Sequence, residues 1–298
     1  MIENVLLQTN FPDLKLFRQG KVRDVYDVGE YYLIVSTDRL SAFDVIMNQG
    51  IPYKGKVLTK ISEFWFKFAE EIIENHLIST NVNEYPDICQ PYKSDLTDRS
   101  MLVKKSRVVP IESVVRGYIS GSGWSDYKQS GKICGIDLPE GLEESEKFTE
   151  PIFTPATKEE IGAHDQNISE DEAKKIAGTE TINFMKEKTI SIYKLASEFA
   201  LNKGIIIADT KMEFGFYKDR IILIDELLTP DSSRFWPSEK YMKGRGQQSY
   251  DKQIIRDYLS SIKFNKQPPP PDLPDNVIEK TSEKYLEVLY KLTGIQLK

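Results

Sequence analysis

Residues 205–215, IIIADTKMEFG, carry three charged side chains at alternate positions of a segment that begins as an apolar strand. Alternate side chains of a strand share one face and lie about 6.6–6.8 Å apart. Asp209, Lys211 and Glu213 are therefore predicted to line one face of a strand that starts in the core. Carboxylates and a lysine in this pattern could bind a divalent cation and a phosphate.

The next predicted strand, residues 221–228, would bring a further carboxylate to this face. Only a short turn separates the two strands, so they should pair antiparallel. Either Asp225 or Glu226 would be added, because adjacent residues point to opposite faces. Facing carboxylates need neutralisation, and Mg²⁺ typically takes one or two carboxylates plus substrate phosphates. A solvated hairpin face with a cross-strand Lys–Glu pair is the alternative, which spacing alone leaves open.

Two segments nearer the N-terminus have residues suited to an anion. Gly20, followed by Lys21 and Arg23 at a hairpin tip, offers backbone N–H groups and cations, although it is neither a Walker loop nor a kinase glycine loop. Arg116 ends an apolar strand and precedes small residues up to Gly123. An arginine with such neighbours suits a phosphate or carboxylate through bidentate pairing and backbone donors.

Two further candidates lie nearer the C-terminus. The segment LTPDSSRFWP, residues 228–237, places an aspartate, two serines and an arginine between a strand and aromatic residues. Lys252 and Arg256 are four residues apart on a predicted helix, so they share a face that could bind a phosphate. Each candidate also has a plainer interpretation, as a turn, a capped strand end or a solvated basic face.

The composition argues against several classes of protein. A net charge of −6 and a pI near 5.3 argue against a general nucleic-acid binder. No apolar run approaches the ~18–20 residues of a membrane helix, and the first residues do not form a signal peptide. Cys89 and Cys134 lack metal spacing, which indicates a reducing, cytoplasmic environment. With His76 and His164 as the two histidines, a histidine-rich metal site is excluded.

The elements that must position these residues follow from periodicity, turns and caps. Strands are predicted as a hairpin over 16–37, as a pair within 100–119 around Pro110, and at 205–214 and 221–228, with a long ordered loop over 140–170. Helices are predicted at 58–72, after a capping box of Ser169 and Glu172, and at 181–203, 248–259 and 276–293, the last following a stiff proline spacer at 266–275. This order predicts an α+β fold with two lobes.

Taken together, the segments match a known family. VVPIESVVRGYISGS (108–122) and IADTKMEFG (207–215) resemble the two diagnostic segments of the phosphoribosylaminoimidazole-succinocarboxamide synthase, or SAICAR synthase, family. Other family blocks follow in the same order: GKVRDVYDVG, STDRLSAFDVIM, LTKISEFWFKF, PIFTPATK, LIDELLTPDSSRFW and SYDKQIIRDYL. The resemblance runs from about residue 16 to 293 and is to the longer single-chain form rather than the shorter bacterial form.

The resemblance implies an ATP- and Mg²⁺-dependent ligase of purine biosynthesis. It would join L-aspartate to the carboxylate of 5-amino-1-(5-phosphoribosyl)imidazole-4-carboxylate, forming SAICAR, ADP and phosphate through an acyl phosphate. Family members pair a β-rich nucleotide-binding lobe with an α/β lobe related to ATP-grasp and kinase folds. We accordingly expect an ATP-binding lobe at 1–112, an α/β lobe with the metal and substrate site at 113–265, and a proline linker with a packing helix at 266–298.

Carried over by position, the resemblance assigns roles to individual residues. The strand at 102–112 would form the adenine pocket, and the ATP-binding set is Gly20, Lys21, Val22, Arg23, Val103, Glu112 and Lys211. Glu213 and Asp225 would ligate Mg²⁺. The catalytic set is Lys211, Arg116 and Asp209. Lys252 and Arg256 would hold the 5′-phosphate of the ribonucleotide, within a substrate set of Asp38, Ser41, Asp44, Arg116, Ser122, Asp231, Ser233, Arg234, Lys252 and Arg256.

One segment departs from the family pattern. GAHDQNIS carries Gln166 where related long-form chains carry an acidic residue, which would change the electrostatics of the aspartate site if this segment shapes it. His164 and Asp165 in this segment are given no catalytic role.

Two other functions compete with the ligase. A small-molecule kinase or another ATP-grasp ligase would share the lobe chemistry, although the chain has neither an HRD-type catalytic loop nor a DFG motif. A nucleotide-binding module without activity would have lost its metal ligands, yet Lys211, Glu213 and Asp225 are all present. We expect a monomer that binds small-molecule substrates and neither nucleic acid nor membrane.

Overall fold

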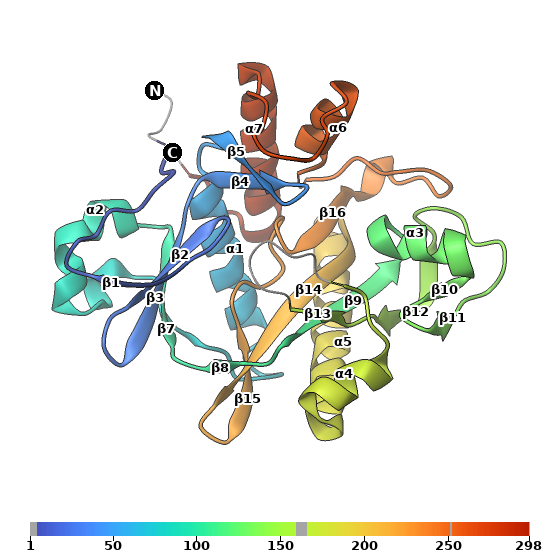
Figure 1. Cartoon of the computed structure of the whole chain (residues 1–298), viewed down its shortest axis with the longest axis horizontal. Coiled ribbons are helices and arrows are strands. Elements are labelled where there is room, and N and C mark those ends of the chain that lie inside the picture. Colours follow the sequence, from blue (N-terminus) through green and yellow to red (C-terminus); the bar gives the residue numbers. More distant parts are fainter. Residues whose placement is uncertain (1–4, 159–165, 251, 298) are drawn as a thin grey trace.

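The computed structural model describes residues 5–158, 166–250 and 252–297 of the 298-residue chain. The fold mixes helices with antiparallel sheets, which confirms the predicted combination of secondary structures (Figure 1). Two larger sheets carry many of the candidate residues. None of the helices in the described ranges is long and apolar enough to span a membrane.

The first sheet has five strands in the order β1–β2–β3–β7–β6. They span Lys15–Gln19 (β1), Arg23–Asp27 (β2), Tyr31–Ser36 (β3), Leu77–Ser79 (β6) and Ser100–Lys104 (β7). The hairpin predicted over 16–37 is therefore a three-stranded meander, because the chain turns at Gly20–Val22 as well as at Gly29. The short helices Val82–Glu84 (η1), Asp87–Tyr92 (η2) and Lys93–Leu96 (α2) pack on one face through a core that includes Tyr26, Leu33 and Leu96.

The second sheet is built around one long strand, Ile205–Tyr217 (β14). β14 pairs with Arg107–Val108 (β8), Ile111–Tyr118 (β9), Arg220–Ile224 (β15) and Ser233–Pro237 (β16). Lys147–Phe153 (β12) and Ala156–Thr157 (β13) extend this sheet by pairing with β9. The prediction of a loop over 140–170 is therefore wrong for these residues. β15 ends at Ile224, earlier than the predicted residue 228.

Helix Thr179–Asn202 (α5) covers one face of this second sheet (Figure 1). It packs against β14 and β9, and its buried residues include Ile182, Met185, Ile192 and Ala196. Before it, Glu170–Ala177 (α4) begins with the predicted capping box, in which Ser169 and Glu172 each accept a backbone N–H from the other. Gly121–Ser130 (α3) packs beside the two-stranded sheet of Lys132–Ile133 (β10) and Ile136–Asp137 (β11).

Segments from both ends of the chain pack together on the remaining side. Lys54–Phe68 (α1), predicted at 58–72, contacts the C-terminal helix Asp275–Thr293 (α7). The hairpin of Arg39–Ala42 (β4) and Val45–Gly50 (β5) shares a hydrophobic cluster with Gln253–Ser261 (α6) and the start of α7. Figure 1 shows α6, α7 and this hairpin at the top of the molecule.

Candidate active site

A cavity of about 490 Å³ brings together most of the predicted site residues. It opens between the β1–β2 turn, the β4–β5 turn, β14 and the start of α6. Its walls include Gly20, Lys21, Val22, Arg23, Ser41, Asp44, Glu112, Lys211, Glu213, Asp225, Asp231, Lys252 and Arg256. Segments more than 200 residues apart in the sequence thus face one volume.

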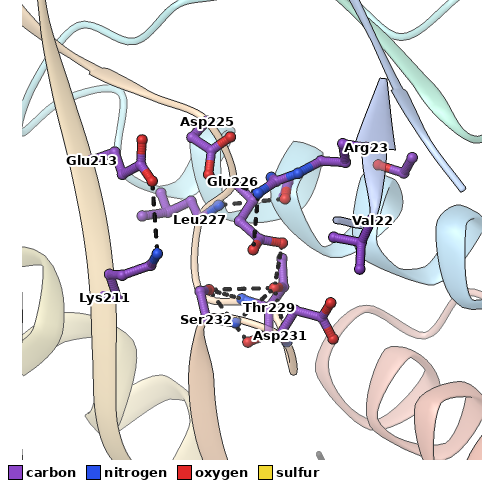
Figure 2. A network of polar contacts seen from close by, with 12 residues as sticks. Val22, Arg23, Lys211, Glu213, Asp225, Glu226, Leu227, Thr229, Asp231 and Ser232 are labelled. Atoms are coloured by element: carbon purple, nitrogen blue, oxygen red, sulfur yellow. Dashed lines mark hydrogen bonds and ion pairs between the residues drawn. The ribbon is translucent and has the colours of Figure 1, made fainter. Parts of the chain in front are cut away.

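Lys211 and Glu213 present their charges to this cavity from alternate positions of β14. Lys211 Nζ lies 2.5 Å from Glu112 Oε1, on the neighbouring β9. It also lies 3.7 Å from Glu213 Oε1 (Figure 2). Lys158 forms an ion pair with the other Glu213 oxygen. Burial disfavours the charge of Lys211, but Glu213 and Glu112 outweigh burial and raise the pKa of Lys211 above its usual value. Lys211 therefore stays protonated and positively charged.

Arg23 links β2 to the end of β15. Its Nη2 lies 2.8 Å from Asp225 Oδ2 and 3.4 Å from Glu226 Oε1. The expectation that Asp225 and Glu226 lie on opposite strand faces is wrong, because β15 ends at Ile224 and Asp225 has a left-handed φ of 68°. Burial opposes the charge of Asp225, yet Arg23 and then Lys158 lower the pKa of Asp225 to about 2. Burial raises the pKa of Glu226 instead.

The side chain of Asp231, which is 3% exposed, lies in the wall of the cavity. Its Oδ2 accepts a hydrogen bond of 2.7 Å from Lys54 and lies 3.3 Å from Lys252 Nζ, and its Oδ1 accepts one of 2.7 Å from the Tyr285 hydroxyl. Burial opposes its charge, but Lys252 and Lys54 lower the pKa of Asp231 below its usual range. Lys252 immediately precedes α6 and Arg256 lies within it, so the predicted pair does share one side of the cavity.

Arg116 and Asp209 form a separate buried cluster. Asp209 accepts hydrogen bonds from Arg234 at 2.7 and 2.8 Å, from Ser120 at 3.0 Å and from Arg116 at 3.3 Å. Arg116 also donates to Ser122 Oγ at 3.1 Å. Neither Arg116 nor Asp209 lines the first cavity. Asp209 therefore orients two arginines rather than joining the Lys211–Glu213 face.

A second cavity of about 500 Å³ lies next to the Asp209 cluster. It is lined by Ser120, Gly121 and Arg234, and Arg256 lines both cavities. Gly121 has a φ of +55°, and a Cβ there would lie 2.2 Å from the Arg234 guanidinium. Glycine at this position therefore allows the start of α3 to approach Arg234 closely.

Several predicted residues lie outside both cavities. Asp38 is buried, where it pairs with Arg99 at 2.9 Å and accepts the Gly55 N–H. Ser233 shares a buried hydrogen bond of 2.8 Å with Thr210, and Val103 lies in the core on β7. These contacts position backbone segments around the cavities. His164 and Asp165 fall outside the described residues, whereas Gln166 lines a different, exposed pocket beside α3 and α4.

Sequence reasoning missed some of the residues that line the first cavity. Lys158 contacts Glu213, and Phe43 and Arg18 also line the walls. Lys158 ends the block PIFTPATK, which is the one sequence signal that could have identified it. Strand alternation predicts either Asp225 or Glu226 on this face, whereas both line this cavity.

Comparisons with known proteins agree on one family. A family model described as SAICAR synthetase matches residues 16–271. The phosphoribosylaminoimidazole-succinocarboxamide synthases of Geobacter metallireducens and Thermodesulfovibrio yellowstonii are each 59% identical over 98% of this chain, covering 98% and 100% of their own. The solved structure of SAICAR-synthase from Saccharomyces cerevisiae complexed with SAICAR is 43% identical, with a TM-score of 0.89 over 100% of both chains. A SAICAR synthetase (Type-2) in complex with ADP, 24% identical, shares the fold with a TM-score of 0.68 over 94% of this chain and 99% of that one.

Proposed function

Because this chain belongs to the SAICAR synthetase family, it is an ATP-dependent ligase of purine biosynthesis, and we propose that its chemistry takes place in the cavity between Lys211 and Arg256. The reaction joins L-aspartate to the carboxylate of 5-amino-1-(5-phosphoribosyl)imidazole-4-carboxylate and yields SAICAR, ADP and phosphate. The observation that supports this location is that one cavity is lined by Lys211, Glu213, Asp225, Lys252 and Arg256.

ATP binds, in this proposal, between the first sheet and β14. Gly20 donates its N–H to Arg23 O at 2.7 Å, which closes a tight turn beside the cavity, and Val25 and Ile34 add apolar wall. Lys211 would meet the phosphates, because it is held charged within reach of the same volume. Glu112, now paired with Lys211, would turn to the ribose hydroxyls. Val103 would support the adenine pocket from the core rather than contact the base.

Glu213 and Asp225 would hold Mg²⁺. Within the described ranges no three His, Cys, Asp or Glu side chains gather as a metal site by themselves. Two carboxylates suffice where substrate phosphates supply the other oxygens. Glu213 lies opposite Ile224, the residue before Asp225, and both carboxylates are paired with cations that a metal ion could replace. The donor set therefore fits. Mg²⁺ held by Glu213 and Asp225 would supply positive charge that neutralises the ATP phosphates.

The ribonucleotide would lie toward α6 and the second cavity. Lys252 and Arg256 would bind its 5′-phosphate, with Arg234 close by, since Arg256 lines both cavities. Ser41, Asp44 and Asp231 would line the same space, while Asp38, Arg116, Ser122 and Ser233 would act from behind it by fixing the walls. The SAICAR complex of the yeast relative supports binding of this class of ribonucleotide.

The carboxylate is activated, we infer, as an acyl phosphate. A carboxylate oxygen of the ribonucleotide attacks the γ-phosphorus of ATP, and ADP departs. The aspartate amine then attacks the acyl carbon, loses a proton and expels phosphate. Lys211 stabilises the transferring phosphoryl group by charge, and Arg116 and Asp209 keep Arg234 in place for the substrate.

An isotope experiment tests this order of bonds. Ribonucleotide labelled with ¹⁸O in its carboxylate should transfer one label to the released phosphate, as mass spectrometry of the phosphate would detect. Multiple-turnover release of ADP should require both the ribonucleotide and aspartate, because the acyl phosphate is consumed only when the amine attacks it. Unlabelled phosphate would exclude the acyl phosphate, and continued ADP release over many turnovers without aspartate would favour the kinase alternative.

We also propose a lobe organisation, an oligomeric state and a location for the whole chain. The two lobes would be residues 1–112 and 113–265, related to ATP-grasp and kinase folds, with 266–298 packed on the body. β9 starts at Ile111 and so crosses the proposed boundary between the lobes. The protein would act in the cytoplasm as a monomer. It would bind small molecules and neither nucleic acid nor membranes. Size-exclusion chromatography with light scattering would test the monomer.

A further inference from the structure

The C-terminal helix reaches into the wall of the first cavity through one hydroxyl. Tyr285 lies on α7, in a segment expected to serve packing alone, yet its Oη donates a hydrogen bond of 2.7 Å to Asp231 Oδ1. The Tyr285 side chain is fully buried, and Asp231 lines the cavity. A residue 54 positions away in the sequence thus holds one oxygen of a cavity carboxylate.

The other oxygen of Asp231 is shared by two lysines. Lys54, the first residue of α1, donates at 2.7 Å and has no exposed side-chain surface. Lys252 lies 3.3 Å away and faces the cavity. Lys54 Nζ also lies 5.9 Å from the centroid of the Tyr285 ring. Three elements, α1, α7 and the start of α6, therefore meet at one carboxylate.

A carboxylate removed from water needs partners that fill its lone pairs. Tyr285 and Lys54 are both buried and satisfy Asp231 from the side away from the cavity, so its rotamer is fixed by groups that do not face the substrate. Lys252 is the partner that remains at the cavity wall. The geometry of Lys252 consequently depends on two residues behind Asp231.

We propose that Tyr285 and Lys54 are positioning residues for the ribonucleotide: they fix Asp231, and Asp231 holds Lys252 where it binds the 5′-phosphate. The C-terminal helix then belongs to the substrate site. This inference rests on the proposed role of Lys252, and the two claims can be tested separately.

The test compares two hydroxyl deletions on α7. Tyr285→Phe removes the bond to Asp231 and keeps the ring, whereas Ser282→Ala removes a buried hydroxyl that donates to Pro52 O at 2.8 Å, away from the cavity. We expect Tyr285→Phe to raise KM for the ribonucleotide by about tenfold, since hydrogen bonds to charged groups are among the stronger ones. KM for ATP should stay within about twofold, and Ser282→Ala should change neither value. Equal ribonucleotide KM values in the two variants would overturn the proposal.

A double-mutant cycle tests whether Tyr285 acts on the substrate through Lys252. If Tyr285 acts through Lys252, Tyr285→Phe should have no further effect on KM in a Lys252→Ala background; an undiminished effect there would overturn the proposal. The Lys252→Ala variant alone tests the role of Lys252, independently of the cycle. A raised KM for the ribonucleotide, with an unchanged KM for ATP, would assign Lys252 to the ribonucleotide. Should Tyr285→Phe not fold, Asp231→Asn keeps the shape and removes the charge that holds Lys252, so it should raise the same KM as Lys252→Ala. A normal KM in Asp231→Asn would equally overturn the proposal.

Discussion

On β14, Lys211 and Glu213 face the first cavity, whereas Asp209, two residues earlier, pairs with Arg116 and Arg234. The alternation of a strand brings such residues to one face but does not make them partners. The two arginine partners of Asp209 come from β9 and β16, which lie on either side of β14 at this point, whereas Lys211 pairs with Glu112 of β9. A single row of charges thus serves two different clusters.

Glu213→Gln tests the metal assignment at the scale of one residue. Removing one charged oxygen should lower kcat by more than about 100-fold, because a metal ion supplies several kcal/mol of charge stabilisation in the transition state. Stabilisation of the protein by Mg²⁺ with an ATP analogue, measured as a shift in Tm, should also disappear.

The matched control for this change is Glu74→Gln. Glu74 pairs with Lys104 and Arg220 and does not line the cavity, so the loss of its charge should leave kcat unchanged. Full activity and a normal Mg²⁺-dependent Tm shift in Glu213→Gln would show that Glu213 is not a ligand.

Arg116→Ala tests whether the buried Asp209 cluster serves the ribonucleotide. Arg116 holds Asp209 and Ser122, so its loss should let Arg234 move and should weaken ribonucleotide binding by at least about tenfold. Breaking a buried ion pair also costs about 3–5 kcal/mol of stability. Calorimetry below the lowered Tm should give an unchanged Kd for an ATP analogue, which serves as the internal control. An unchanged ribonucleotide Kd would contradict this role.

At the scale of elements, a local signal located the start of α4 but not the end of β15. The capping box of α4 is formed by neighbouring residues and was predictable from spacing alone. The end of β15 was not, because Asp225 turns into a left-handed conformation beside Arg23 of β2, about 200 residues earlier in the chain. The same turn brings both Asp225 and Glu226 to Arg23.

Ser169→Ala should destabilise the protein through α4 alone. The Ser169 side chain accepts the Glu172 N–H, and loss of such a cap costs about 1 kcal/mol. Urea unfolding should show a lower midpoint with an unchanged slope. Ser130→Ala, which removes an exposed hydroxyl bonded to backbone carbonyls, is the comparison and should have a smaller effect. Equal stability of Ser169→Ala and the unaltered protein would contradict the contribution of the cap.

At the scale of the whole molecule, the C-terminal helix closes the core that α1 begins. α7 buries Tyr285, Val288, Leu289 and Leu292 in the cluster that also contains Trp65 of α1. The chain therefore brings its last long helix back to its first, and the first cavity lies between elements from both halves.

Removal of residues 275–298 should prevent folding rather than only lower activity. Four large buried side chains contribute about 1.5–3 kcal/mol each, a sum comparable to the total stability of about 5–15 kcal/mol. Circular dichroism and urea unfolding of the truncated chain should show no cooperative transition. The milder Leu289→Ala should fold but lose about 2–5 kcal/mol. A truncated chain with a cooperative transition near that of the full chain would contradict this prediction.

Sequence patterns by themselves predicted the long helices, the β14–β15 hairpin and the charged residues that we propose bind a phosphate and a metal ion. These features depend on neighbours within a few residues, such as the Ser169–Glu172 cap or the alternation from Lys211 to Glu213. The block resemblance added the family and the remaining candidate residues.

Only the tertiary structure decided which of those charges face one another. Lys158 reaches Glu213, Arg23 reaches both Asp225 and Glu226, and Tyr285 reaches Asp231 across gaps of roughly 50 to 200 residues, for which periodicity carries no signal. Burial and neighbouring charges then set the charge states. Arg23 helps to keep the Asp225 carboxyl group ionised, whereas burial makes the neighbouring Glu226 carboxyl group harder to ionise. Electrostatics in a folded protein depend on these distances and on exclusion of water, and both exist only after the chain has folded.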